Sequence, residues 1–449
     1  MTTGKEWKII LLFSLPLMAG NLLQQLYSIV GGIIVGNFIN ERAFASVITC
    51  QPLTTLFLSV ALGLSVGASI VISQNYGADR KDRLPVAVDT ALILLGICGI
   101  VFSVLGIVLS PVLLKNLLGV PEDLLPNSIA YMRVYCVGLI FQFLYNGIAA
   151  ALRSVGDSKA TLYFLLIATL LSTVLTFLFI LVIPWGVAGS ALATVLAQLA
   201  CVIVSYIYLR KRFPYSKTEK HWDKEIAGTM AKLGLPIALQ MGIISIGHGA
   251  MNRLVNSLEP TAPGIISAYG ASSRIEMFIF VPISGFQSGL ASFVGQNIGA
   301  GKLDRANRGF GLATAMATAA TIVLSIIAAI FAGPIVTIFG LSGNALQLGM
   351  EKLRFLAFFY WMFASYNTLG GLLQGAGDTL IQSAASLFAL SMQVATGYLF
   401  VYLGLFGYAA VWVAQPFGWG GALSVTLIRY ITGGWKKKAI VGKISQGGD

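Results

Sequence analysis

The feature that most constrains this chain is the length of its stretches without a charged residue. Two of them, 160–209 and 379–428, each run for 50 residues. A helix of about 20 apolar residues is long enough to cross the hydrocarbon core of a bilayer. Charged residues make up only 10% of the chain, against about 25% in soluble proteins. Because the chain has too little charge to cover a water-facing surface, the sequence predicts an integral membrane protein.

Ten charge-free windows mark the expected spans. They cover residues 9–40, 43–78, 90–114, 134–152, 160–209, 233–252, 277–301, 309–350, 355–377 and 379–428. Each 50-residue window must fold back once, at 184–186 and around 404–407, where helix-breaking residues lie in mid-window. The short segment 260–273 joins the following window as one helix, which carries Arg274 and Glu276. We therefore expect an all-α fold of twelve transmembrane helices, the first of them retained as an anchor.

The charges outside these windows predict the orientation. The chain has 29 Lys and Arg against 17 Asp and Glu, a net charge of +12. Most of the basic residues fall on alternate connections, and the other connections hold little beyond Arg42, Lys115 and Arg253. The positive-inside rule then predicts a multi-pass protein of the plasma membrane, the inner membrane in bacteria, with both termini cytoplasmic. The basic excess is explained by topology and membrane lipids, so we expect no nucleic-acid partner.

The second half of the chain repeats motifs of the first at an offset of about 220 residues. The repeated pairs are Leu15-Pro16 with Leu235-Pro236, Gly63-x-x-x-Gly67 with Gly285-x-x-x-Gly289, Gln74 to Ala78 with Gln296 to Ala300, Gly156-Asp157 with Gly377-Asp378, and Leu196 to Gln198 with Val413 to Gln415. Because six spans is an even number, both halves enter the membrane from the same side, as a parallel repeat. We expect an N-lobe over 1–212, a cytoplasmic linker over 213–228 and a C-lobe over 229–449.

Two similar bundles can rock about a shared interface and expose a cavity to each side in turn, which is the behaviour of a transporter. A channel is the simpler alternative. The sequence has no phosphate-binding loop, and its four cysteines lie in apolar stretches without a disulfide or zinc pattern. Since no pair of groups resembles a catalytic site, we expect a non-enzyme that needs neither a cofactor nor a metal site.

One carboxylate is expected well inside the membrane. Glu276 follows Gly264 by twelve residues, about 18 Å along a helix. An ionised carboxylate at such a depth costs at least about 2.5 kcal/mol and usually faces a bundle interior or a wet cavity. There it can take up and release a proton or a metal cation. We predict Glu276 and Arg274 as ion-coupling residues; the alternative is that they only neutralise each other or a polar neighbour, although their i, i+2 spacing puts them on different faces.

Uncharged polar and aromatic residues in mid-helix are candidates for a substrate cavity. They are Gln24, Tyr27, Gln51, Tyr145, Asn146, His248, Tyr366, Asn367 and Gln393. A cavity for an amphipathic organic compound is mostly apolar and aromatic, with a few polar anchors. For each residue alone, hydrogen bonding between helices is the competing interpretation. We expect the protein to bind a small organic substrate and to act as a monomer.

Several motifs resemble those of the multidrug and toxic compound extrusion (MATE) transporters. They are Leu22 to Tyr27 with Ile33 to Gly36, the two Gln-Asn-x-Gly-Ala segments, Leu152 to Asp157, Gly186 to Thr194 and Ala268 to Glu276. The resemblance spans nearly the whole chain. It implies two six-helix lobes arranged in a V, and export of cationic or amphipathic compounds in exchange for protons or sodium.

The chain departs from this family at two acidic positions. Where members commonly read Tyr-Asn-Ile-Val-Asp-Thr, this sequence has Gly31 at the acid, and a second commonly acidic position is Thr176. Neither side chain exchanges a proton near neutral pH, so coupling is expected to depend on Glu276. Three interpretations stay open beside a coupled exporter: a flippase for lipids or lipid-linked oligosaccharides, an uncoupled or weakly coupled protein, and a non-transporting homologue.

Overall fold

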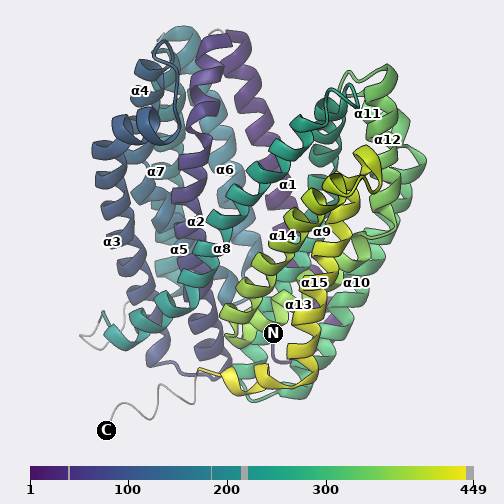
Figure 1. The fold of residues 1–449 in the computed structure, drawn as a ribbon. Coiled ribbons are helices and arrows are strands. Elements are labelled where there is room, and N and C mark those ends of the chain that lie inside the picture. The colour runs from purple at the N-terminus through teal and green to yellow at the C-terminus, as the bar shows by residue number, and fades with distance from the viewer. Residues whose placement is uncertain (39–40, 184, 214–220, 441–449) are drawn as a thin grey trace. The chain divides into compact units, whose positions relative to one another are not determined.

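A computed structural model describes residues 1–38, 41–183, 185–213 and 221–440, with only the backbone of 27–38, 41 and 44 (Figure 1). This part of the chain is helical and contains no strand, which confirms the predicted all-α class. The helices of the first half are α1 (Glu6–Phe38), α2 (Glu41–Gly77), α3 (Arg83–Val112), α4 (Leu125–Val137), α5 (Leu139–Ser154), α6 (Ser158–Phe177) and α7 (Gly186–Arg212). Those of the second half are α8 (Lys224–Ser257), α9 (Ile265–Gly299), α10 (Leu303–Ile330), α11 (Ala332–Thr337), α12 (Gly343–Ala357), α13 (Tyr360–Ala376), α14 (Thr379–Tyr402) and α15 (Ala410–Ile431).

The lengths of these helices match membrane spans. Within the described residues, nine helices are long and apolar enough to cross a bilayer, and the pair α4 and α5, bent by 43°, makes ten. The short α11 and the pair α12 and α13 follow α10, and α15 ends the bundle. Three charged residues at 351–354 make α12 less apolar than the other spans, and α12 and α13 together have the length of one bent span.

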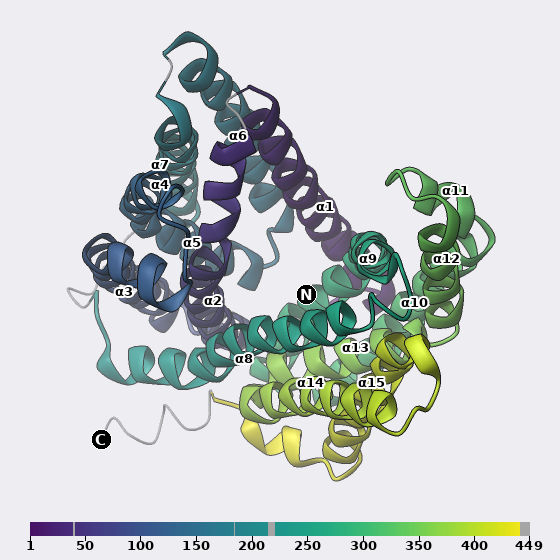
Figure 2. The same cartoon turned by 45° about the horizontal axis from the view of Figure 1, so that its top comes forward.

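Both predicted reversals inside the long windows are present. In the window 160–209, one helical segment ends at Val182 and α7 begins at Gly186. Pro184, within the predicted reversal, lies outside the described residues. In the window 379–428, the chain reverses between α14 and α15, where Gly404 and Gly407 have φ of 66° and 54°. Glycine adopts these left-handed angles without a steric penalty, so it allows the chain to turn back. α14 and α15 then lie side by side, as both views show (Figure 1 and Figure 2).

The described residues form two compact units. The N-unit comprises residues 19–239, and the C-unit comprises residues 1–18 and 240–440. These units differ from the predicted lobes, which divide the chain at 213–228, because the division falls inside α1 and inside α8. The start of α1 belongs to the C-unit and the start of α8 to the N-unit. The lobe boundaries drawn from the repeat remain a prediction.

The first repeated glycine pair explains why the start of α8 belongs to the N-unit. Gly63 and Gly67 of α2 lie against Gly234 and Ala238 of α8. A Cβ atom at Gly67 would lie 2.1 Å from the carbonyl oxygen of Met230, which is closer than atoms pack. Small residues at this spacing allow two membrane helices to approach until their backbones touch. The motif therefore forms a helix-packing surface.

The second glycine pair makes the same contact in the C-unit. Gly285 and Gly289 of α9 lie against Met18 and Ser14 of α1. A Cβ atom at Gly289 would lie 2.2 Å from the Ser14 Oγ. In each unit, the second helix of one half of the chain thus packs closely against the beginning of the first helix of the other half.

Candidate functional site

Glu276 lies on the packed face of α9. Its neighbours on this face, Ser272, Ile279 and Ile283, recur at the three- and four-residue spacing of a helix stripe and are all buried. Glu276 is itself only 3% exposed. A carboxylate that shares a stripe with apolar residues is buried when the helix packs, so it needs a compensating partner.

The partner is Lys352 of α12, which is fully buried. Its Nζ lies 3.0 Å from the Glu276 Oε1. The same ammonium donates a hydrogen bond to the Ser273 Oγ at 2.8 Å and lies 3.9 Å from the centroid of the Tyr269 ring. Three neighbours from α9 therefore surround one cation: a carboxylate, a hydroxyl and an aromatic face.

The packing of α12 on α9 explains how Lys352 reaches this position. Leu348 and Leu356, one turn before and one turn after it, are buried on the same side of α12. The hydroxyl of Ser272 donates to the carbonyl of Gly349 at 3.3 Å. This hydrogen bond and the buried leucines hold α12 against α9 with Lys352 directed towards Glu276.

The other side of Glu276 faces uncharged polar groups. The Gln415 Nε2 of α15 lies 3.4 Å from the Glu276 Oε2. Within the described residues, the Gln415 Oε1 and the Tyr360 hydroxyl of α13 are buried without a hydrogen-bond partner. Glu276 also acts electrostatically on His248 of α8 and on Tyr360. Buried polar groups are usually paired, so unpaired groups beside a carboxylate indicate a place where an ion, water or ligand can bind.

Arg274, predicted together with Glu276, lies on the exposed side of α9. The two residues therefore lie on different faces of the helix, and the cation beside Glu276 is Lys352. Sequence reasoning missed Lys352 because it lies between the charge-free windows 309–350 and 355–377, where a connection is expected. The signal that could have found it is its i±4 spacing from Leu348 and Leu356, which places it on an apolar stripe.

The cavity candidates of the N-unit have varied surroundings. Gln24 and Gln51 are exposed. The Tyr145 hydroxyl donates to the Thr161 carbonyl at 3.3 Å, and the Asn146 Nδ2 donates to the Gln142 carbonyl at 2.8 Å. The side chain of Tyr27 lies outside what the structure describes, and residue 31 is described by its backbone only. Hydrogen bonds to helix carbonyls fit a packing role for Tyr145 and Asn146, and the cavity remains a prediction.

The candidates of the C-unit are equally mixed. His248 is exposed and Gln393 is partly buried. Tyr366 is buried and its hydroxyl is hydrogen-bonded to that of Ser386. The Asn367 Nδ2 donates to the Phe363 carbonyl of its own helix at 2.8 Å. Their predicted role in binding substrate likewise remains a prediction.

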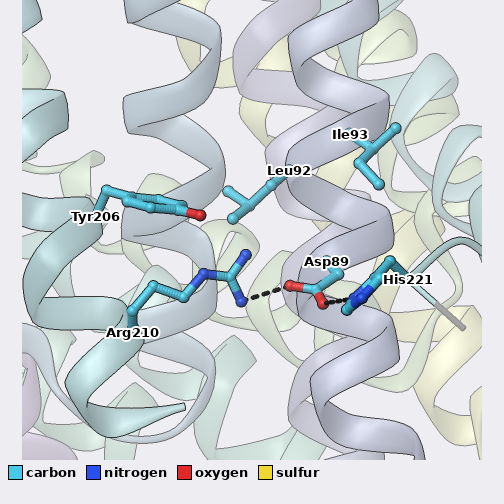
Figure 3. Close-up of a pocket in the computed structure, with 6 residues that line it drawn as sticks. All are labelled: Asp89, Leu92, Ile93, Tyr206, Arg210 and His221. Atoms are coloured by element: carbon cyan, nitrogen blue, oxygen red, sulfur yellow. Dashed lines mark hydrogen bonds and ion pairs between the residues drawn. The ribbon is translucent and has the colours of Figure 1, made fainter. Parts of the chain in front are cut away.

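A second charged cluster anchors the end of the linker to α3 in the N-unit (Figure 3). Asp89 is 3% exposed and lies 2.5 Å from the Arg210 Nη1 and 2.9 Å from the His221 Nδ1. These residues line a pocket of 310 Å³ together with Tyr206 and two aliphatic side chains. Since the backbone amide of Asp223 also donates to the Thr90 hydroxyl at 3.1 Å, the segment before α8 is held by several polar contacts.

Comparison with known proteins identifies relatives over the full length. The MatE family profile matches residues 16–178 and again 236–399. A probable multidrug resistance protein, YoeA of Bacillus subtilis, is 29% identical over 97% of this chain and 95% of its own length. A second B. subtilis protein, the probable multidrug resistance protein YpnP, is 30% identical over 84% of each chain.

A solved structure shows the same fold. The outward-facing conformation of a multidrug resistance MATE family transporter of the MOP superfamily matches with a TM-score of 0.89, at 24% identity and over 97% of both chains. This likeness confirms the predicted class of twelve helices in two lobes, and the double match of the family profile agrees with the internal repeat. The chain therefore belongs to the MatE family, the multidrug and toxic compound extrusion transporters.

Proposed function

We propose that this multi-pass membrane protein is a secondary active exporter of amphipathic, cationic organic compounds, which it exchanges for protons or sodium by alternating access. Two relatives named as probable multidrug resistance proteins support export of organic compounds. One charge crossing 100 mV supplies about 2.3 kcal/mol, enough to drive substantial accumulation. The cavity residues predicted from the sequence would supply the polar anchors for such a substrate.

The observation that carries the proposal is the buried pair of Glu276 and Lys352. Removing one partner of a buried ion pair costs about 3–5 kcal/mol, because the other charge is left uncompensated. A proton or cation that binds Glu276 removes the same attraction. Ion binding would therefore weaken the contact between α9 and α12 and shift the populations of conformations that differ in this contact. In this proposal Lys352 takes the place of Arg274, which is exposed.

We also propose that both termini are cytoplasmic in the plasma membrane of a bacterium and that the protein acts as a monomer. Basic residues in the last turn of α7, at 210–212, and in the 3₁₀ turn Gly434–Lys438 support this orientation. Both segments would lie on the inner side, where the positive-inside rule expects Lys and Arg.

Transport into proteoliposomes tests the coupling role. Uptake of a labelled organic cation is measured under an imposed proton gradient and, separately, under a sodium gradient. Glu276→Gln should lose gradient-driven uptake, whereas Glu122→Gln, which changes an exposed acid paired with Lys115, should not. Since Glu276→Gln leaves Lys352 uncompensated, Glu276→Gln combined with Lys352→Met is assayed beside it. Undiminished gradient-driven uptake in the folded double variant would remove the assignment, and lipid flipping without cation uptake would favour the flippase.

A further inference from the structure

We infer that Glu276, Ser273 and Tyr269 form an ammonium-binding site whose resident occupant is the side chain of Lys352, and that this tethered cation decides which cations reach Glu276. The inference rests in part on the proposed function, since it assigns a cation selectivity to the same carboxylate. It also makes a claim about binding that does not depend on transport.

The contacts of Lys352 are those that a free primary amine would make. An ammonium group carries three N–H donors and has no acceptor. Here it has a carboxylate oxygen at 3.0 Å, a hydroxyl oxygen at 2.8 Å and a ring centroid at 3.9 Å. The face of a tyrosine ring attracts a cation through its quadrupole, and this attraction is strongest when water is excluded. All three neighbours come from the 269–276 segment of α9, so the site is formed by one helix and filled from another.

The surroundings of this ion pair resemble a ligand-binding site more than a structural ion pair whose polar neighbours are all hydrogen-bonded. Tyr269 packs against a core cluster that contains Tyr360 and Trp412. A mostly apolar and aromatic wall with a few polar groups is typical of pockets for small organic molecules. The buried Tyr360 hydroxyl and the Gln415 Oε1 still have unused hydrogen-bonding capacity within the described residues. These two groups are available to hydrogen-bond a bound ligand or a displaced Lys352 ammonium.

Tethering gives Lys352 an advantage over any dissolved cation. A group held on the same chain competes at a high effective concentration, so sodium and small amines must displace an ammonium already in contact with the carboxylate. A proton that binds a Glu276 oxygen does not need the volume that the Lys352 ammonium occupies. The geometry therefore favours the proton as coupling ion, and amine-bearing compounds as the substrates able to replace Lys352.

A binding titration with Lys352→Ala tests the site directly. This substitution removes three carbons and the nitrogen, and n-propylammonium carries the same atoms. We expect n-propylammonium to raise the melting temperature of purified Lys352→Ala in a saturable way, by about 2 °C or more. The wild-type protein should show no such rise, because its site is filled. The neutral isostere propan-1-ol should have no effect on either protein.

The matched control is Lys352→Ala combined with Glu276→Gln, which keeps the cavity and lacks the carboxylate. The inference would be overturned if n-propylammonium did not raise the melting temperature of Lys352→Ala. It would also be overturned if the double variant showed an equally large rise. A Lys352→Ala protein that can be purified only in the presence of n-propylammonium would support it. If Lys352→Ala does not fold with or without n-propylammonium, uptake by the wild-type protein is the test. Uptake driven as well by a sodium gradient as by a proton gradient would contradict the inference.

The two hypotheses fail in different experiments. Normal gradient-driven uptake by the Glu276 variants would reject the coupling role while leaving the amine titration intact. Conversely, an absent amine response together with lost uptake in Glu276→Gln would keep the coupling role and reject Lys352 as the occupant of an ammonium site.

Discussion

Nine residues before the first glycine of the repeated pair, the two halves of the chain differ in charge. The C-unit has Glu276 nine residues before Gly285, and the N-unit has Thr54 nine residues before Gly63. Glu276 is buried against Lys352, whereas the Thr54 hydroxyl donates to the Gln51 carbonyl of its own helix at 2.9 Å. An uncharged side chain that is hydrogen-bonded to its own helix has no charge for an ion to compensate. At these equivalent positions, the C-unit therefore has a buried ion pair and the N-unit has an uncharged side chain bonded to its own helix.

The framework around these positions is alike in both halves. Each glycine pair packs against the start of a first helix. Each unit also has an aspartate before a later helix: the Tyr208 hydroxyl donates to Asp157 at 2.7 Å, and the Arg429 Nε donates to Asp378 at 2.6 Å. Repeated architecture with different charges is what duplication followed by divergence of one site would produce.

The largest expected effect sharpens this comparison. Lys352→Met should lower the free energy of unfolding in detergent by about 3–5 kcal/mol, because the Glu276 carboxylate is left buried and unpaired. Thr54→Val, at the matching place of Glu276 in the N-unit, should stay within about 0.5 kcal/mol of the wild type. Adding Glu276→Gln to Lys352→Met should recover most of the loss. Equal effects of Lys352→Met and Thr54→Val would break the comparison.

The glycine pairs predict a smaller effect that also differs between the units. Gly67→Ala should cost about 2–3 kcal/mol, near the upper end of overpacking, because the new Cβ meets the backbone oxygen of Met230. Gly289→Ala should cost about 1 kcal/mol, because the Ser14 side chain can rotate away. Thermal unfolding measures both.

A second substitution distinguishes the two glycine sites. Ser14→Ala removes the oxygen that the new methyl group at position 289 would meet, so it should restore the stability of Gly289→Ala. No side-chain change at residue 230 can restore Gly67→Ala, since the obstacle there is backbone. A full rescue of Gly67→Ala by Met230→Ala would show that the contact is not made as described.

Local patterns predicted much of this fold. Charge-free windows and helix breakers located the spans and both reversals, and the depth of Glu276 along its helix predicted its burial. The partners of the buried charged residues could not be predicted in the same way, because they depend on which helices pack against each other. Asp89 and Asp378 directly precede the charge-free windows 90–114 and 379–428, where a helix boundary is expected, yet they are 3% and 1% exposed and paired with Arg210 and Arg429.

The same limit applies to Lys352 and to the two units. A lysine near the end of an apolar window resembles a loop residue until α12 packs on α9. The exchange of helix starts between the units depends on contacts between residues that are 163 and 275 positions apart, Gly67 with Met230 and Gly289 with Ser14. Periodicity within one window contains no information about such distant partners.

The two aspartates predict a further, smaller difference. Asp157→Ala should cost about 1 kcal/mol, the usual value for a helix cap, because its Oδ1 accepts from the Ala160 amide at 3.2 Å. Asp378→Ala should cost about 1.5 kcal/mol or more, since it leaves the charged Arg429 without its carboxylate. Denaturant titration of both variants measures the difference. A greater loss at Asp157 would mean that its cap, its hydrogen bond from Tyr208 and its 3.8 Å contact with Arg212 together outweigh the Arg429 pair.

The smallest expected effect concerns the loop before α9, where Glu259 accepts from the Gly264 and Ile266 amides at 2.7 and 3.0 Å. These hydrogen bonds lower the pKa of Glu259 from its ordinary value of 4.5. A carboxyl group with a lowered folded pKa stabilises the protein above the unfolded pKa and loses that contribution as pH falls through the folded pKa. Glu259→Gln should therefore reduce the melting temperature slightly near neutral pH, and the gap from the wild type should close in acid. A Glu259→Gln gap of constant size down to the acid limit would mean that the side chain acts by shape alone and that its charge contributes nothing to stability.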